Sequence, residues 1–172
     1  TEILQGTGVK QDDGVVVDQH MQTNLDDIYA AGDITRFYDT ILGEYAQNGA
    51  WGSAKEQGAV AGENMVAGDE AESFRWVSSY SITHFDFPFL SFGHPTLGDD
   101  HAERKYSDTE WRRLAFKDGQ LIGGVLIGDL APQSKYKQLI REERSVADQK
   151  EVLLQQDVDL DDLDATAAAE SE

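Results

Sequence analysis

Apolar and β-branched runs in the first third of the chain predict two short strands. The run "GVVVD" at Gly14–Asp18 follows the turn signal "QDDG", which is typical of a strand that starts after a turn. A second short strand is expected at Asp27–Asp33, with the sequence "DIYAAGD". The other residues up to about position 48 are expected to form loops.

A helical period begins near Gly49. Small or flexible residues recur there at spacings of three and four, namely Ala50, Ala54, Gly58, Ala61 and Met65. A stripe of such residues suits close approach to a backbone or a flat ligand better than it suits a bulky core. Gly68 is expected to end this helix.

The second half of the chain predicts a small sheet followed by a helix. Residues 74–92 are aromatic and β-branched, which predicts two short strands with a break near Pro88. The clearest hairpin is Glu110–Asp129, where Lys117-Asp118-Gly119 supplies the turn. After Pro132 the helical period returns, at Tyr136, Leu139, Ile140 and Glu143.

These elements predict a mixed fold, α/β in its first part and α+β in its second. Residues 1–70 have the pattern of the end of an α/β unit, and residues 71–150 that of a small antiparallel sheet followed by a helix. Residues 151–172 are acidic and of low complexity, so we expect a disordered tail there, with disorder beyond about Asp157.

The charge balance is strongly acidic, with 14 Lys and Arg against 33 Asp and Glu and a formal charge of -19. Such a surface disfavours binding to nucleic acid and to an anionic membrane. Because 40% of the residues are hydrophobic, the charge indicates a folded protein adapted to high salt rather than disorder.

We therefore predict that the melting temperature rises strongly between low and molar KCl. Screening shortens the reach of like-charge repulsion to a few Å at roughly 1 M salt. Thermal unfolding across a KCl series measures the effect. A melting temperature that stays constant or falls would contradict the interpretation as a halophilic protein.

Other bulk features narrow the chemistry. The chain has no cysteine, which removes disulfides, thiolate metal sites and a cysteine nucleophile. Its first residues, "TEILQGTGVK", have no basic region followed by an apolar core, and runs such as "GGVLIG" are far too short to span a membrane. We expect a cytoplasmic protein.

The segment "LDDIYAAGDITRFYD", Leu25–Asp39, contains the main candidate for function. Small residues followed by a carboxylate at the end of a buried strand allow a ligand to approach the backbone and donate a hydroxyl hydrogen bond. In context, the residues Val17, Asp18, Thr23, Asp27 and the block "IYAAGD" resemble a flavin-contact motif of the FAD-dependent pyridine-nucleotide oxidoreductases. "WGSAKEQGAVAGENM", Trp51–Met65, resembles the helix that this family aims at the flavin ring.

The resemblance implies which residues contact the cofactor. It places the FAD-binding carboxylate on Asp33, beside Gly32, and the start of the flavin-facing helix on Gly49, Ala50, Trp51 and Gly52. The positive end of that helix would stabilise reduced, anionic flavin. Residues 1–70 would then be the C-terminal remnant of an FAD-binding domain.

The resemblance extends to the second part of the chain. "FLSFG" at Phe89–Gly93 and the hairpin strand at Asp118–Asp129 are similar to the C-terminal interface domain of the same group. The members with the most similar pattern are NADH oxidases, rubredoxin or ferredoxin reductases and nitrite reductase large subunits. The resemblance implies a possible homodimer through residues 74–128.

One departure from the family is large. No G-x-G-x-x-G nucleotide-binding turn occurs in the chain, so the grip on the FAD adenosine and the whole NAD(P)H site would lie outside it. We expect the C-terminal portion of a longer enzyme, which needs the N-terminal part of the same polypeptide, binds FAD poorly alone and catalyses nothing alone. The alternative is a stand-alone, non-catalytic interaction module that retains this part of the fold.

Three weaker patterns favour plain structural roles. The "HPT" at His94–Thr96 has Asp99 five residues after its histidine, a spacing that serves a cysteine pair in the disulfide reductases, and the chain has no cysteine. His84 and His101 carry no sign of convergence on a metal. The tail at Asp157–Asp164 lacks the glycine and glutamate of a calcium loop. We expect neither catalytic residues nor metal ligands in this chain.

Overall fold

The computed structural model describes residues 2–67, 70–84, 86–160 and 163, which form two compact units. The first unit is Thr1–Trp76 and the second is Val77–Glu172. The boundary lies later than the expected one at residue 70, because Phe74 packs edge-to-face on Phe37 of the first unit at 5.1 Å between ring centroids.

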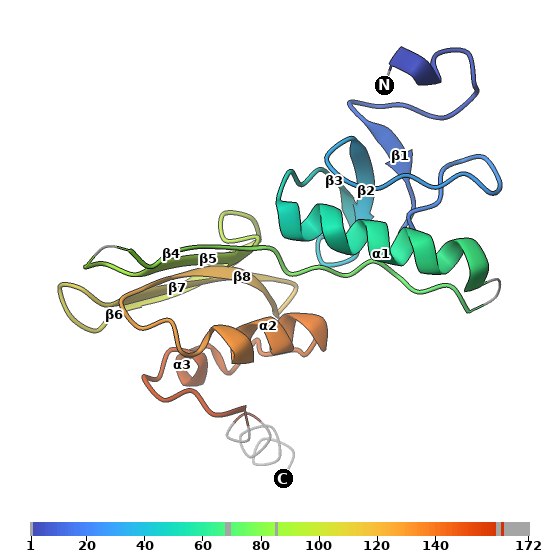
Figure 1. Ribbon diagram of the computed structural model, residues 1–172. Coiled ribbons are helices and arrows are strands. Elements are labelled where there is room, and N and C mark those ends of the chain that lie inside the picture. The colour runs from blue at the N-terminus through green and yellow to red at the C-terminus, as the bar shows by residue number, and fades with distance from the viewer. Residues whose placement is uncertain (1, 68–69, 85, 161–162, 164–172) are drawn as a thin grey trace, which may run out of the picture. The chain divides into compact units, whose positions relative to one another are not determined.

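The first unit combines a three-stranded sheet with one long helix (Figure 1). Its elements are η1 Glu2–Leu4, β1 Val15–Val17, β2 Thr35–Asp39, β3 Glu44–Ala46 and α1 Trp51–Ala67. Strands β1 and β2 are parallel, with Val17 opposite Phe37, and β3 adds to β2 in the antiparallel sense. The apolar core gathers residues of β1, β2 and α1: Val9, Val15, Val17, Met21, Phe37, Val60, Ala61 and Phe74.

The predicted strand at Gly14–Asp18 is confirmed as β1, but the predicted strand at Asp27–Asp33 is wrong. Asp27 (φ +62°) and Gly32 (φ +90°) both adopt left-handed backbone conformations, which interrupt an extended run. Between them only Tyr29 forms an isolated bridge, with Gln22. The next strand after β1 is instead β2, which begins at Thr35, and Asp33 belongs to the turn that leads into it.

Helix α1 is confirmed, and of the predicted small-residue stripe Ala61 is buried while Ala50 and Ala54 are half-buried. The buried residues are Ser53, Gln57, Val60, Ala61 and Asn64. Gly58 and Met65, which the small-residue stripe placed on the contact face, are exposed. The buried face is largely polar because its amides and hydroxyl bond to backbone and side chains around it, so a search for apolar periodicity misses it. Gly68 lies outside the described residues.

The second unit is a five-stranded antiparallel sheet with helices on one face (Figure 1). Its elements are β4 Ser79–Ile82, β5 Phe89–Gly93, β6 Asp100–Lys105, β7 Trp111–Lys117, β8 Gln120–Ile127, α2 Gln133–Arg141 and α3 Lys150–Leu153. The strand order is β4-β5-β8-β7-β6. The two strands expected within residues 74–92 and the hairpin at 110–129 are confirmed, with the turn at Asp118 (φ +50°) and Gly119 (φ +76°). Strand β6 was not predicted.

Helix α2 packs on β5 and β8, where the Tyr136 and Phe92 rings stack at 5.7 Å between centroids. Tyr136, Leu139 and Ile140 are buried as the helical period predicted, whereas Glu143 lies beyond the helix with φ +53°. Strand β8 has no room for a side chain at Gly123, because a Cβ there would lie 2.3 Å from the backbone nitrogen of His94, the residue after β5. Glycine at this position therefore allows β5 and β8 to approach closely.

The acidic end of the chain differs from the expected disordered tail in the part that the structure describes. Leu153, Leu154, Val158 and Leu163 are all buried. We refer to residues 153–160 with Leu163 as the C-terminal strap. Residues 161–162 and 164–172, which include part of the calcium-like pattern, lie outside the described residues.

Among the described residues, six long side chains hold the strap by its backbone carbonyls. They come from β6, β7, α2, the loop after β6 and the residue before α3: Arg104, Tyr106, Arg112, Lys135, Tyr136 and Gln149. The Tyr136 hydroxyl donates to the Leu153 carbonyl at 2.6 Å, and Lys135 donates to that of Val158. These bonds supply partners for carbonyls that follow the end of helix α3 and have no helical partner of their own.

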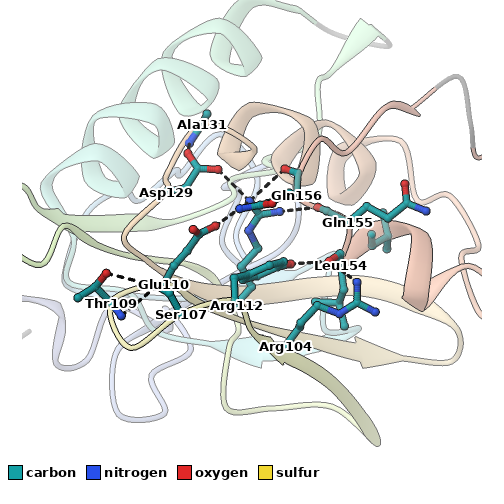
Figure 2. Close-up of polar contacts among 12 residues, drawn as sticks. Arg104, Ser107, Thr109, Glu110, Arg112, Asp129, Ala131, Leu154, Gln155 and Gln156 are labelled. Atoms are coloured by element: carbon teal, nitrogen blue, oxygen red, sulfur yellow. Dashed lines mark hydrogen bonds and ion pairs between the residues drawn. The ribbon is translucent and has the colours of Figure 1, made fainter.

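Arg112 is at the centre of these contacts and is fully buried (Figure 2). Its guanidinium donates to the carbonyls of Gln155 at 2.7 Å and Gln156 at 3.2 Å, and to Asp129 Oδ2 at 2.8 Å. It also lies 4.8 Å from the centroid of the Tyr106 ring. A buried guanidinium needs such partners to offset its lost hydration, so Arg112 ties the strap to strand β7.

Candidate functional site

The turn at Gly32–Asp33 leads into strand β2 and presents the predicted carboxylate. Gly32 has φ +90°, a conformation that glycine adopts without strain. Asp33 is exposed, and its carboxylate takes part in none of the hydrogen bonds or ion pairs between described residues. Both oxygens of Asp33 are therefore available to accept hydrogen bonds from a ligand.

The start of helix α1 lies beside this turn. Asn48 Oδ1 accepts the Ala50 N–H at 2.9 Å and so shapes the entry into the helix. A Cβ built on Gly49 would lie 4.0 Å from Asp33 Oδ2. The structure thus brings together the two segments that the sequence assigned to one site, although they are separated by a hairpin in the chain.

Trp51 and Gly52 lie in the first turn of α1 and differ in their surroundings. Trp51 is 81% exposed, with Lys55 Nζ 5.9 Å from its ring centroid, so it contributes nothing to the core. A Cβ on Gly52 would lie 2.8 Å from the Trp76 ring. The absence of a side chain at Gly52 is therefore required by packing against Trp76, whatever other role the residue has.

A buried polar network joins the turn to the helix, and the sequence analysis did not assign it. Gln57 Oε1 accepts the Gly32 N–H at 2.8 Å, and the Thr35 hydroxyl lies 2.8 Å from the same oxygen. Gln57 Nε2 donates to Ser53 Oγ at 3.3 Å. Gln57 and Ser53 have no exposed surface and Thr35 is 1% exposed. Gln57 lies within the Trp51–Met65 motif, where a polar residue among small ones could have indicated a buried hydrogen bond.

A second buried amide anchors the other end of α1. Asn64 Nδ2 donates to the carbonyls of His20 at 2.9 Å and Glu72 at 2.8 Å, and its Oδ1 accepts the Glu72 N–H at 2.8 Å. Asn64 is 4% exposed. Because it holds the chain on both sides of the helix, its role is structural.

The weaker candidates have structural contacts. Asp99 Oδ2 accepts the Asp118 N–H at 3.2 Å, and the His94 N–H donates to the Ile122 carbonyl, so both residues shape turns beside the sheet. Within the described part of the chain, no three His, Asp or Glu side chains gather as they would around a metal ion. A pocket of about 210 Å³ beside the strap has Asp157 and Asp159 in its lining. Another, of about 180 Å³ beside β1, is lined in part by Val17, Asp18 and Thr23 of the predicted flavin-contact motif. No helix of the described residues is long and apolar enough to cross a membrane.

Part of each unit matches the model of a known protein family. Residues 1–58 match the family model "Pyridine nucleotide-disulphide oxidoreductase", and residues 81–144 match "Rubredoxin NAD+ reductase C-terminal domain". A human protein named pyridine nucleotide-disulfide oxidoreductase domain-containing protein 1 is 28% identical over 162 residues, which cover 88% of this chain and 32% of that protein. The NADH-rubredoxin oxidoreductase of Clostridium acetobutylicum is 24% identical, with 84% of this chain and 36% of that protein covered.

Solved structures agree on the fold. The covalent putidaredoxin reductase–putidaredoxin complex matches 98% of this chain and 40% of the other at a TM-score of 0.78 and 19% identity. The NADH:rubredoxin oxidoreductase of C. acetobutylicum matches 84% of this chain and 37% of the other, with a TM-score of 0.57 and 24% identity. The architecture is thus shared with the pyridine-nucleotide-dependent reductases.

Both units are therefore similar in sequence to parts of the pyridine nucleotide-disulphide oxidoreductases. It spans about a third of the length of the curated relatives that it matches. The predicted resemblance to these oxidoreductases and the mixed fold class are confirmed.

Proposed function

We propose that this chain forms the C-terminal portion of a flavoprotein oxidoreductase that passes electrons from NAD(P)H through FAD to an acceptor. The NAD(P)H site and the grip on the FAD adenosine would lie outside these residues, because the chain has no G-x-G-x-x-G turn. The observation that carries the proposal is the meeting of Asp33 with Gly49 at the start of α1.

The residues at this place fit a flavin. The Asp33 carboxylate is exposed and has no partner among the described residues, so it can accept a hydrogen bond from a hydroxyl of the cofactor's sugar-alcohol chain. Gly32 and Gly49 leave the backbone uncovered beside it. Bound FAD would supply the redox chemistry, and this chain would supply orientation and charge stabilisation.

The first turn of α1 would act through its unpaired N–H groups. These groups carry partial positive charge at a helix start and favour negative charge on a bound group nearby. Because no acidic side chain lies in the first turn of α1, none of its own residues offsets that effect. The helix start would therefore favour the reduced, anionic form of a flavin ring placed against it.

A titration with FAD tests the proposal on the polypeptide expressed from the natural gene. Asp33→Ala is expected to weaken FAD binding by about tenfold to a hundredfold, the loss for a hydrogen bond to a charged group. Asp26→Ala is the matched control, since Asp26 is an exposed acid of the same segment that belongs to no predicted contact. Quenching of flavin fluorescence measures the dissociation constants.

Two results would contradict the proposal. Equal FAD affinity of the wild type and Asp33→Ala would show that the Asp33 carboxylate does not bind the cofactor. Failure of the wild type to bind FAD would overturn the flavoprotein proposal and leave the non-catalytic interaction module as the leading hypothesis.

A further inference from the structure

Gln57 is the one residue of α1 whose side chain bonds to the turn that presents Asp33, among the contacts of the described residues. It lies nearly two helical turns beyond the helix start, on the face turned toward the sheet. Its amide is fully buried, and it bonds to Gly32, the residue immediately before Asp33. The contact therefore links the two segments that compose the candidate site.

The orientation of the Gln57 amide is fixed at both ends. Its oxygen accepts the Gly32 N–H, and its nitrogen donates to Ser53 Oγ one helical turn earlier. Exchanging the amide's oxygen and nitrogen would set an N–H₂ group against the Gly32 N–H, which is also a donor. The network thus specifies one rotamer and one direction, and no other arrangement satisfies its buried groups.

The backbone at Gly32 needs such an anchor. With φ +90° it adopts a conformation open to glycine, and glycine has more alternative conformations than any other residue. The Thr35 hydroxyl lies 2.8 Å from both the Gly32 carbonyl and Gln57 Oε1, so its single proton serves one of them and closes the network. Without Gln57, the Gly32 N–H would lose its partner and the turn its defined orientation.

We propose that Gln57 is a positioning residue, which holds the Gly32–Asp33 turn in fixed register with the start of α1. The Asp33 carboxylate and the helix N–H groups then face the cofactor as one preorganised surface. This inference rests on the proposed function. The gain comes from ordering the site before binding, since a turn that is already ordered loses less conformational entropy when the ligand arrives.

Gln57→Met tests the inference, because methionine keeps the length of the side chain and removes both polar atoms. In the polypeptide expressed from the natural gene, it is expected to weaken FAD binding roughly tenfold, the lower end of the effects of removing a group that orients a ligand-contacting residue. It is also expected to accelerate hydrogen exchange at the Gly32 amide, which loses its acceptor. Gln57→Glu keeps an acceptor facing Gly32 and is expected to restore slow exchange there.

Gln149→Met provides a matched control in the second unit. Gln149 is also buried, with 7% of its surface exposed, and its amide donates to the Leu163 carbonyl at 2.6 Å, so the chemical change is the same and the burial is similar. It is expected to lower stability without changing FAD affinity or Gly32 exchange. Unchanged Gly32 exchange in Gln57→Met, or equal loss of FAD affinity in both variants, would overturn the inference.

The two proposals fail in different ways. If the wild type binds no FAD, the proposed function and the flavin part of this inference fall together. Exchange at Gly32 would still decide whether Gln57 holds the turn. If the wild type binds FAD and Gln57→Met leaves both readouts unchanged, the positioning role alone fails.

Discussion

Replacing Arg112 by methionine is expected to lower the free energy of unfolding by about 3 kcal/mol. The variant removes three hydrogen bonds, to Asp129 and to the carbonyls of Gln155 and Gln156, from a site with no exposed surface. The estimate is at the low end for a broken buried ion pair because the side chain of Asp129 is 39% exposed and regains water. Urea unfolding measures the change.

Arg113→Met is the matched control, because it makes the same change at the next residue of β7, on the opposite face of the strand. We expect it to cost less than 1 kcal/mol, since no ion pair of Arg113 occurs among the described residues. Limited proteolysis adds a second readout, in which the strap of Arg112→Met becomes cleavable before the sheet does. Equal stability of the two variants would contradict the role assigned to Arg112.

Alkaline conditions are expected to destabilise the protein by about 3 kcal/mol through Tyr136. Burial raises the pKa of this phenol from 10.0 to about 12, although the nearby Arg112 guanidinium acts in the opposite direction. Between these two values the unfolded chain releases the proton and the folded chain retains it. The stability is therefore fully present below pH 10 and is lost as the pH rises through about 12.

Tyr136→Phe separates this effect from general alkaline unfolding. The variant loses the hydrogen bond to the Leu153 carbonyl, which costs about 1 kcal/mol at pH 7, but it has no phenol to ionise. Its stability should therefore fall less steeply between pH 9 and 12, as unfolding curves at each pH would show. Burial also raises the pKa of Tyr106, so part of the slope should remain. Parallel pH profiles of the wild type and Tyr136→Phe would contradict the assignment.

The sequence predicted those elements whose signals are local. The β-branched run of β1, the Asp118-Gly119 turn and the helical period before Ile140 each depend on residues close together in the chain. The strand predicted at Asp27–Asp33 failed because an apolar run carries no information about the left-handed backbone of Asp27. Strand β6 was missed since its residues alternate only weakly and pair with a strand that comes later.

The candidate site was predictable in its members but not in its connections. The family resemblance supplied Asp33 and Gly49, and the structure shows them close together. Whether they and the other predicted residues contact a flavin stays a prediction. Gln57 escaped because a buried amide has no hydrophobic signal, and its partners lie 22 and 25 residues away in the chain. Such contacts follow from tertiary structure and not from spacing.

The packing of the C-terminal strap was not predicted, for a related reason. Its acidic composition is typical of disorder, yet its backbone carbonyls accept hydrogen bonds and several of its apolar side chains are buried. Most of the donors come from residues 104–136, far from the strap in the sequence, so the residues around the strap do not predict these contacts. Net charge of a segment therefore did not predict its order here.

The strap also sets an order of events during synthesis. Residues 153–163 are translated after every strand of the five-stranded sheet, so the sheet leaves the ribosome before its last core residues exist. In that interval the Arg112 guanidinium lacks its partners, the Gln155 and Gln156 carbonyls, and the apolar surface that Leu153 covers stays exposed to water. The second unit can therefore complete its fold only after translation has passed the strap.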